Sequence, residues 1–377
     1  MKRLLLIVMA ALFLSVGAAK AGPFEDGAAA YERGDYANAL TIFRPLAANG
    51  NAGAQYSLGV LYYKGQGVIQ NYAEAVKWYR LAAVQGDAMA QRQLGGMYYL
   101  GQGVKKELLE ALKWLRLAAT QGDAKAQALL GTIHYTGQDV EQDYSEALKW
   151  FQLAAVQGEL QAQYTLGDIY GKGIGVAQDY SEAAKWHRLA AAQGHKVAQF
   201  NLGAMYEAGQ GVAQDYVESV KWYRLAAAQG YALAQFNLGL MYATGRGVAQ
   251  DSAESVKWYR LAAAQGVAKA QHNLGARYGK GEGVAQDYVE SVKWYRLAAA
   301  QGHALAQSNL GLMYATGQGV AQDYVRAHMW LNLGATSGIA TAMEGRSVVA
   351  GQMTSQQIAE AQKLARECQL RSFKECD

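Results

Sequence analysis

Apolar and polar residues follow a pattern that returns every 36 residues along most of this chain. In the copy spanning residues 52–87, two apolar stripes at helical spacing predict two amphipathic helices. The first stripe consists of Ala52, Ala54, Leu58, Leu61 and Tyr62. The second consists of Tyr72, Ala75, Trp78 and Ala82. Each copy is therefore expected to be a helical hairpin with one face too apolar to remain in water.

The ends of these helices are marked in the sequence. The run Gly65-Gln66-Gly67-Val68 predicts a helix stop and a reversing loop, because glycine adopts positive φ at no steric cost. Asp143 and Glu146, three residues apart before an apolar stripe, predict a capping box, and the same pairing recurs in later copies. Gln85-Gly86 predicts the end of the second helix.

All eight tryptophans stand 36 residues apart, from Trp78 to Trp330. A fixed period of this length is the signature of a repeat architecture. We expect the Trp of one unit to fill the space left by small residues of the next unit, as core and not as a ligand cage. Gly59 also recurs in every copy inside the first helix, where glycine costs about 1 kcal/mol relative to alanine. This cost predicts a neighbour too close for a Cβ atom.

The repeated motifs resemble one known family. Ala-x-Ala-Gln, Leu-Gly, Tyr-x-x-Gly-x-Gly-Val, Asp-Tyr, Lys-Trp and Leu-Ala-Ala-x-Gln-Gly, in eight copies over 52–338, are similar to the Sel-one-like repeat (SLR) family, relatives of the tetratricopeptide repeats. The resemblance implies an all-α fold, an α/α solenoid forming a right-handed superhelix of helix-turn-helix repeats. It also implies a scaffold for protein–protein interactions.

The ends depart from the repeat. Residues 1–21 have a basic start, an apolar run and a small-x-small cleavage pattern, and predict a signal peptide cut after Ala21; an uncleaved anchor is the alternative. Residues 22–51 read as a degenerate repeat and cap, and 339–377 as a capping helix with a tail that contains Cys368 and Cys376. In an exported protein this pair suggests an intrachain disulfide, although free thiols or a bond to another chain stay open.

Charge and composition narrow the possible partners. Cleavage removes three basic residues and no acid, so the formal charge falls from +4 to +1, which argues against nucleic acid. No other stretch approaches the ~20 apolar residues of a membrane span, so no stable membrane insertion is expected after cleavage. We therefore expect a periplasmic or secreted protein.

Catalytic and cofactor motifs are not found in the sequence. The six histidines are spread over five positions of the repeat, since only His195 and His303 are equivalent, and they make no metal-binding pair; no serine nucleophile elbow occurs. The run Gly171–Gly175 lacks the spacing of a phosphate-binding loop. His187 stands where other copies have tyrosine, which indicates a packing or surface substitute. No catalytic residue, metal ligand or cofactor is predicted.

Two variable positions of the first helix are the candidate partner-binding surface, because aromatic residues and arginine dominate binding hot spots. The candidates in the N-terminal half are Tyr56, Tyr63, Arg92, Tyr99, Tyr135 and Tyr164. The alternative is that these side chains fill gaps between adjacent hairpins.

These features predict an exported, non-catalytic scaffold that binds a protein partner, such as an envelope enzyme or assembly. Two alternatives come from other functional classes. One is a β-lactamase-like or other cell-wall-related enzyme, although the chain lacks the per-repeat cysteine pairs of such family members and any Ser-x-x-Lys motif. The other is a peptidoglycan-binding module, for which exposed tyrosines are the hint.

Overall fold

The computed structural model describes residues 22–373 and 376 of the chain, which form twenty α-helices and no strand. The predicted signal peptide lies outside these residues. Within the described part of the chain, no helix combines the length and apolar character that crossing a bilayer requires. The prediction of an all-α repeat fold is confirmed. The chain divides into two compact units, Met1–Leu166 and Gly167–Asp377, and the division falls inside one helix.

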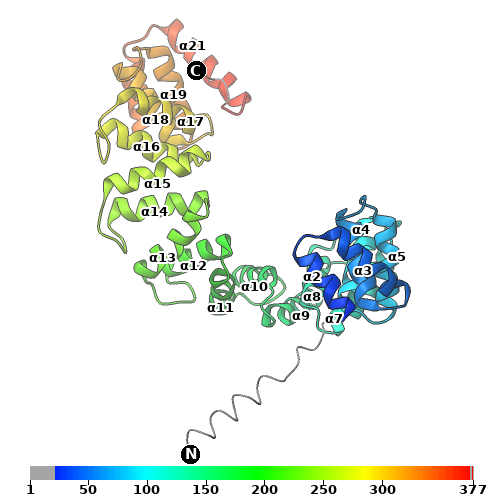
Figure 1. Cartoon of the computed structure of the whole chain (residues 1–377). Helices are drawn as coiled ribbons and strands as arrows, with labels where there is room; N and C mark the ends of the chain where they lie inside the picture. The colour runs from blue at the N-terminus through cyan, green and yellow to red at the C-terminus, as the bar shows by residue number, and fades with distance from the viewer. Residues whose placement is uncertain (1–21, 374–375, 377) are drawn as a thin grey trace, which may run out of the picture. The chain divides into compact units, whose positions relative to one another are not determined.

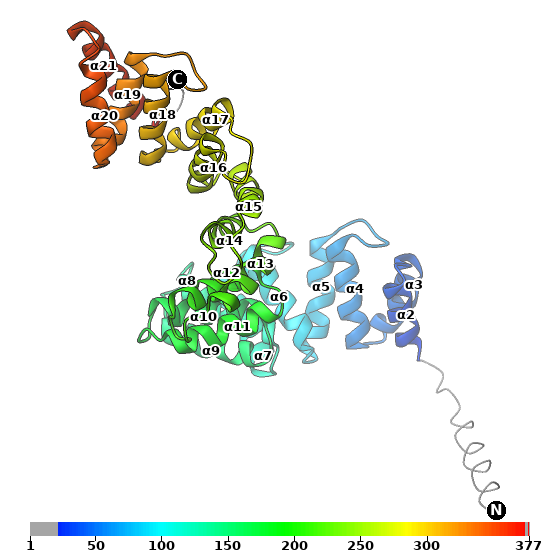
Figure 2. The same cartoon turned by 90° about the vertical axis from the view of Figure 1, so that its left-hand side faces the viewer.

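Unit 1 is a succession of antiparallel helix pairs (Figure 1, Figure 2). Its helices are α2 (Pro23–Glu32), α3 (Tyr36–Ala48), α4 (Ala52–Lys64), α5 (Tyr72–Val84), α6 (Ala88–Leu100), α7 (Leu108–Thr120), α8 (Ala124–Thr136) and α9 (Tyr144–Val156). Helix α10 (Leu160–Lys172) contains the boundary between the units.

Unit 2 continues the same arrangement of packed helix pairs (Figure 1). Its helices are α11 (Tyr180–Ala192), α12 (Lys196–Ala208), α13 (Tyr216–Ala228), α14 (Ala232–Thr244), α15 (Ser252–Ala264), α16 (Ala268–Lys280), α17 (Tyr288–Ala299), α18 (Ala304–Thr316), α19 (Tyr324–Thr336), α20 (Ala340–Ala350) and α21 (Ser355–Leu370). We call the first helix of each repeat its A helix and the second its B helix.

The B helices begin at an aspartate or asparagine cap, as predicted, except α7, whose first turn is preceded by Glu107 without a side-chain cap. The Asp143 side chain accepts a hydrogen bond from the Glu146 backbone N–H at 2.9 Å. The reciprocal half of the predicted capping box is replaced, because the Glu146 carboxylate accepts from Trp150 Nε1 at 2.7 Å and pairs with Lys149. The complete capping box occurs once among the described helices, at Thr354 and Gln357 of α21.

The glycine inside each A helix accommodates a side chain of the B helix in the same hairpin. A Cβ atom on Gly59 would lie 2.5 Å from Cδ1 of Tyr79, which is fully buried. The neighbour predicted from the cost of this glycine is therefore a ring and not a backbone. In later repeats the position of Tyr79 holds Leu115, Phe151, His187, Tyr223, Tyr259, Tyr295 and Leu331. We call it the packing position.

The tryptophans contribute less to the core than the sequence suggested. Trp150 and Trp330 are buried, whereas the other six are half-buried. The predicted direction of their packing was also wrong: Trp258 packs against the core of α13 and α14, which is the preceding B helix and its own A helix. The small residues around this indole therefore belong to the preceding repeat and to its own A helix. In every B helix the residue at the packing position is buried, with an exposed fraction of 6% or less.

A buried glutamine joins each repeat to its predecessor. Gln91 is 4 % exposed, and its Nε2 donates to the Ala83 carbonyl of the preceding B helix at 3.0 Å. Its Oε1 accepts from Gln121 Nε2 of its own B helix at 2.7 Å. The same position holds glutamine in all eight repeats, so this polar bridge is a constant of the stack.

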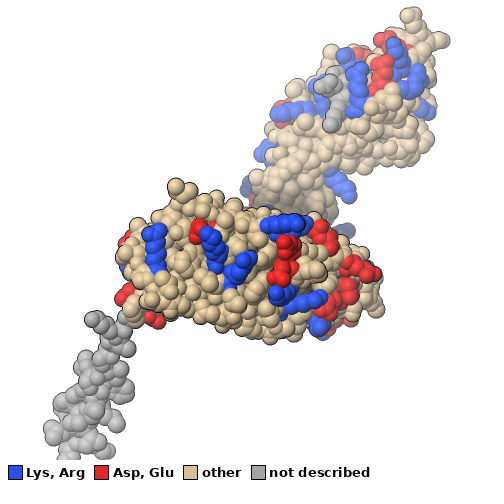
Figure 3. Space-filling view, turned by 90° about the vertical axis from the view of Figure 1, so that its right-hand side faces the viewer, with Lys and Arg blue, Asp and Glu red and all other residues tan. Residues whose placement is uncertain are grey.

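The C-terminal tail closes unit 2. A disulfide joins Cys368 to Cys376, and Phe373 within that loop contacts Gly302. Figure 3 shows Lys and Arg side chains next to Asp and Glu on the face drawn, with uncharged surface between them.

Candidate functional site

One face of the A helices is left mostly half-covered by its neighbours, although Ala243 and Ser308 on this face are buried. In α12 it consists of Phe200, Asn201, Ala204, Glu207 and Ala208, none of which is buried. The opposite side of α12 is buried against the B helices. We call these five positions, in every A helix, the A face.

Three pockets open on the A face between consecutive hairpins. The first, of about 280 Å³, lies between α2 and α4 and is lined by Tyr31, Tyr56, Val60 and Lys64 among others. The second, of about 220 Å³, lies between α10 and α12. The third, of about 480 Å³, lies between α18 and α20. These three pockets occupy equivalent places in different repeats, so they are copies of the same kind of site. Each copy is lined by different side chains.

The six predicted partner-binding residues are all half-buried. Tyr56 lines the first pocket, and its ring centre is 5.8 Å from that of Tyr79. Tyr63 packs on Tyr72, with ring centres 5.3 Å apart, and donates to Gln102 Oε1 of the next repeat at 3.4 Å. The remaining four are Arg92, Tyr99, Tyr135 and Tyr164. Tyr56 packs within its own hairpin and Tyr63 also bonds to the next one, so these two rings act as packing groups as well as surface.

Arg92, Phe200 and His272 occupy the same A-face position in three repeats, and each contacts the residue that directly precedes the next A helix. Arg92 Nε lies 3.1 Å from Asp123 Oδ2, and both side chains are less than one-fifth exposed. Phe200 meets Tyr231 edge-on at 5.1 Å between ring centres, and His272 stacks on His303 at 4.8 Å. The chemistry differs at each junction, but the two partners match one another. Sequence variation at this position thus reflects pairing between neighbouring repeats.

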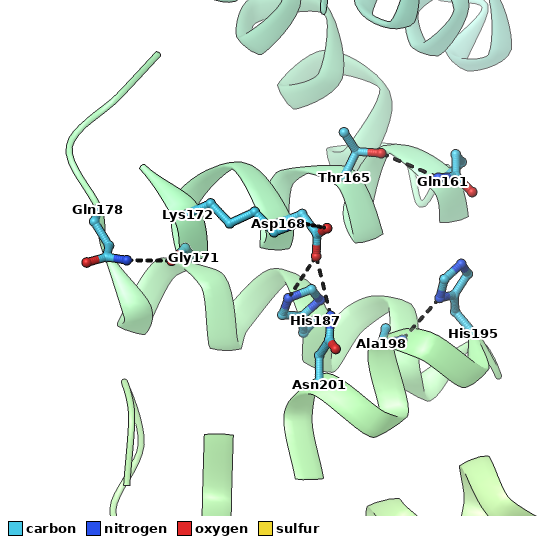
Figure 4. Close-up of polar contacts among 10 residues, drawn as sticks. All are labelled: Gln161, Thr165, Asp168, Gly171, Lys172, Gln178, His187, His195, Ala198 and Asn201. Atoms are coloured by element: carbon cyan, nitrogen blue, oxygen red, sulfur yellow. Dashed lines mark hydrogen bonds and ion pairs between the residues drawn. The ribbon is translucent and has the colours of Figure 1, made fainter. Parts of the chain in front are cut away.

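The second pocket contains the most polar arrangement on the A face. Asp168 of α10 lies between Lys172, His187 and Asn201, which come from α10, α11 and α12 (Figure 4). Asp168 accepts from Lys172 Nζ at 2.6 Å through Oδ2 and from Asn201 Nδ2 at 3.3 Å through Oδ1. His187 Nε2 is 3.7 Å from Oδ1. The pocket is open because Gly171 replaces the tyrosine found at Tyr63, Tyr99 and Tyr135.

Burial determines the charge state of this histidine. His187 is 4 % exposed, and loss of solvent lowers its pKa to about 4, although the nearby Asp168 carboxylate acts in the opposite direction. His187 is therefore neutral at pH 7. The neighbouring His195 also has a lowered pKa, again through burial. The expectation that His187 is a packing substitute agrees with its position beneath Gly167, whose Cβ would lie 2.5 Å from His187 Nδ1.

Asp168 and Asn201 are not among the residues predicted from the sequence. A signal was present for Asp168, because its position holds Val60, Gly96, Thr132 and Ala204 in neighbouring copies, and no other acid. Asn201 is harder to recognise as a site residue, because asparagine also stands at the equivalent positions of the following repeats and so does not distinguish this one. These are Asn237, Asn273 and Asn309. Only the contact between the two side chains shows that they belong together.

The lining of the second pocket includes carboxylate, amine, amide, imidazole, phenol and small side chains. The described residues contain no group of three His, Cys, Asp or Glu side chains placed to hold a metal ion. The side chains around Asp168 include no serine, threonine or cysteine nucleophile among the residues that line the pocket. The arrangement can accept and donate hydrogen bonds and attract charge.

Comparison with known proteins places the chain in a family. The family model for the Sel1 repeat matches eight consecutive segments: 52–87, 88–123, 124–159, 160–195, 196–231, 232–267, 268–303 and 304–339. No curated protein sequence matches the chain.

Two solved structures are similar over most of their length. A Sel1 repeat protein from Oxalobacter formigenes is 35% identical, with 81% of this chain and 88% of that chain covered and a TM-score of 0.61. The protein c5321, a protective antigen of uropathogenic Escherichia coli strains with an SLR fold, is 32% identical, with 94% and 92% covered and a TM-score of 0.51. Both the repeat matches and these likenesses show that this chain belongs to the Sel1 repeat family.

Proposed function

We propose that this protein is an exported, non-catalytic scaffold that binds a partner protein through its A face. The Sel1 repeat solenoid is typically a scaffold for protein interactions, which supports the general class. The observation that carries the proposal is the series of three pockets at equivalent places on the A face, each with its own lining. A partner that spans several repeats would meet a different surface at each.

The aromatic and polar character of the A face fits a protein partner. Phe200, Phe236 and His272 lie at one A-face position in successive repeats, and Asn201, Asn237 and Asn273 lie at the next. Half-buried rings supply contact area, and side-chain amides donate and accept hydrogen bonds, which together suit a polypeptide. The tyrosines predicted from the sequence, Tyr56 above all, belong to this surface at its N-terminal end.

Export is the second part of the proposal and rests on the sequence of residues 1–21. Cleavage after Ala21 would leave Gly22 as the mature N-terminus. Residue 22 is directly followed by α2, so the mature chain would begin at the first helix. Cell fractionation followed by N-terminal sequencing tests this part. An intact Met1 on cytoplasmic protein would contradict it.

Site-specific crosslinking in living cells tests the binding surface. A photoreactive phenylalanine derivative is placed at Ala204 or Leu240 on the A face, and at Lys221 on an exposed B-helix face as the matched control. We expect discrete crosslinked products from the A-face positions and none from the control. Crosslinking from Lys221 alone, or from no position, would contradict the proposal. Hydrolysis of a chromogenic β-lactam by the purified protein would support the enzymatic alternative instead.

A further inference from the structure

The second pocket has a lining that indicates the chemistry of what enters it. It is lined by Asp168, Lys172, Tyr180, His187 and Asn201 together with small residues and Met205. Among the A-face positions of α10 and α12, the acidic residues are Asp168 and Glu207 and the basic residue is Lys172. This stretch of the A face therefore has a negative balance of charge.

The two acids are not solvated surface groups. The Asp168 side chain is 18% exposed, and Glu207 is half-buried with its Oε2 accepting from the Tyr223 hydroxyl at 2.7 Å. Removing a carboxylate from water is costly unless charge or hydrogen bonds compensate it. Asn201 and Lys172 provide part of that compensation for Asp168. His187 adds no charge at neutral pH because it is buried in its neutral form.

Lys172 is the part of this arrangement that can move away. Its side chain is 63% exposed and reaches Asp168 from one turn along the same helix. Because the Lys172 ammonium is mostly solvated, it returns to water at little cost when an incoming cation takes its place and keeps the Asp168 carboxylate paired. The opening at Gly171 gives that cation a path to Asp168, and Tyr180 stands at the rim with an exposed ring.

We propose that the second pocket receives an arginine side chain of the partner protein, which pairs with Asp168 in place of Lys172. A guanidinium group suits the site better than an ammonium group, because it binds a carboxylate with two parallel hydrogen bonds and stacks on aromatic rings. Asn201 holds the carboxylate in place (Figure 4), and Tyr180 covers the entering group. This inference rests on the proposed function and specifies the partner's chemistry at one point of the A face.

Methyl NMR on the full mature chain measures this binding directly. The Met205 methyl group lines the pocket, and Met241, the equivalent residue one repeat later, is buried outside it and serves as an internal reference. The probe is acetyl-Gly-Arg-Gly-amide, and its control carries citrulline, which has the same shape without the charge. We expect the arginine peptide to shift Met205 and not Met241, with an effect that weakens as salt is added.

Three variants separate the parts of the proposal. Asp168→Asn should weaken binding about tenfold or more, because it removes the charged acceptor. Gly171→Tyr should block the pocket without touching Asp168, since a Cβ at this position meets only Ala183 at 3.6 Å and other copies carry tyrosine there. Lys172→Ala should strengthen binding by removing the competing cation. Circular dichroism verifies that each variant is folded.

The result that overturns the inference is equal binding of the arginine and citrulline peptides, or no response of Met205 to either. An undiminished response in Asp168→Asn also overturns it. The proposed function is judged separately, because crosslinks from Ala204 and Leu240 in cells do not depend on arginine. Crosslinking without an arginine response therefore removes only the pocket chemistry.

Discussion

Two adjacent glycines in helix α6 allow a sharp test of how the hairpins are packed. A Cβ atom on Gly95 would lie 2.7 Å from Cγ of the fully buried Leu115 and 3.1 Å from the Ala111 carbonyl oxygen. A Cβ atom on Gly96 would meet nothing within 4 Å. The same substitution to alanine thus adds a methyl group to a filled space at one residue and to open space at the next.

The expected energies have opposite signs. Alanine in place of glycine inside a helix contributes about 1 kcal/mol of stability through backbone entropy and helix propensity. At Gly95 this gain is outweighed, because forcing a methyl group into a close-packed core costs about 1–3 kcal/mol. We expect Gly95→Ala to lower the free energy of unfolding by about 1 kcal/mol and Gly96→Ala to raise it by about the same amount.

Urea unfolding followed by far-ultraviolet circular dichroism gives the comparison, with hydrogen exchange of the α6 and α7 amides as a local readout. The local readout matters because long repeat arrays do not always unfold in one step. If Gly95→Ala proved as stable as Gly96→Ala, the close approach of α6 and α7 would not be the reason for the glycine.

Three further predictions follow from individual contacts. His187→Phe should make the free energy of unfolding less sensitive to acid. The pKa of His187 is about 4 in the folded chain and about 6.5 in the unfolded chain, so protons bind the unfolded state first. The resulting stability of about 3 kcal/mol is fully present above pH 6.5 and is lost as the pH falls toward 4. Urea midpoints at pH 7 and 4.5 should differ less in the variant than in the wild type. Arg92→Ala and Asp123→Asn should be coupled by about 1–2 kcal/mol in a double-mutant cycle, because their half-buried pair is lost with either change; additive effects would contradict this. The double change Asp139→Gly with Lys106→Gln should raise the melting temperature. Asp139 has a φ of 68°, which glycine adopts without strain. The exposed ion pair lost with this change, between Asp139 and Lys106, contributes less than about 1 kcal/mol.

Periodicity in the sequence was sufficient to predict the hairpins and their stacking. The Asp143 caps and the Gly65 turn follow from local rules that act within a few residues, so no tertiary information was needed. The role of the tryptophans was harder to predict. Size and periodicity do not reveal that Trp258 packs on the preceding repeat or that a B-helix residue such as Tyr259 is buried more deeply.

The candidate site was only partly predictable for a physical reason. Arg92 stands out in a column of varied residues, but its partner Asp123 lies 31 positions away and looks like an ordinary helix cap. Asp168 and Asn201 are likewise 33 residues apart and come from different repeats. Which side chains meet between repeats is decided by the stacking of the hairpins, and this cannot be read from their positions along the sequence.

The matched pairs at successive junctions have a consequence for how this protein can change over evolutionary time. The Gln91 type of bridge is the same in every repeat, so a whole hairpin could be gained or lost without disturbing it. The contacts of Arg92 with Asp123 and of His272 with His303 are different, because each requires one specific successor. Shuffling the hairpins could leave the Arg92 guanidinium facing an imidazole such as His195 or the phenol ring of Tyr231. Selection therefore acts on the order of the hairpins along the chain as well as on how many there are.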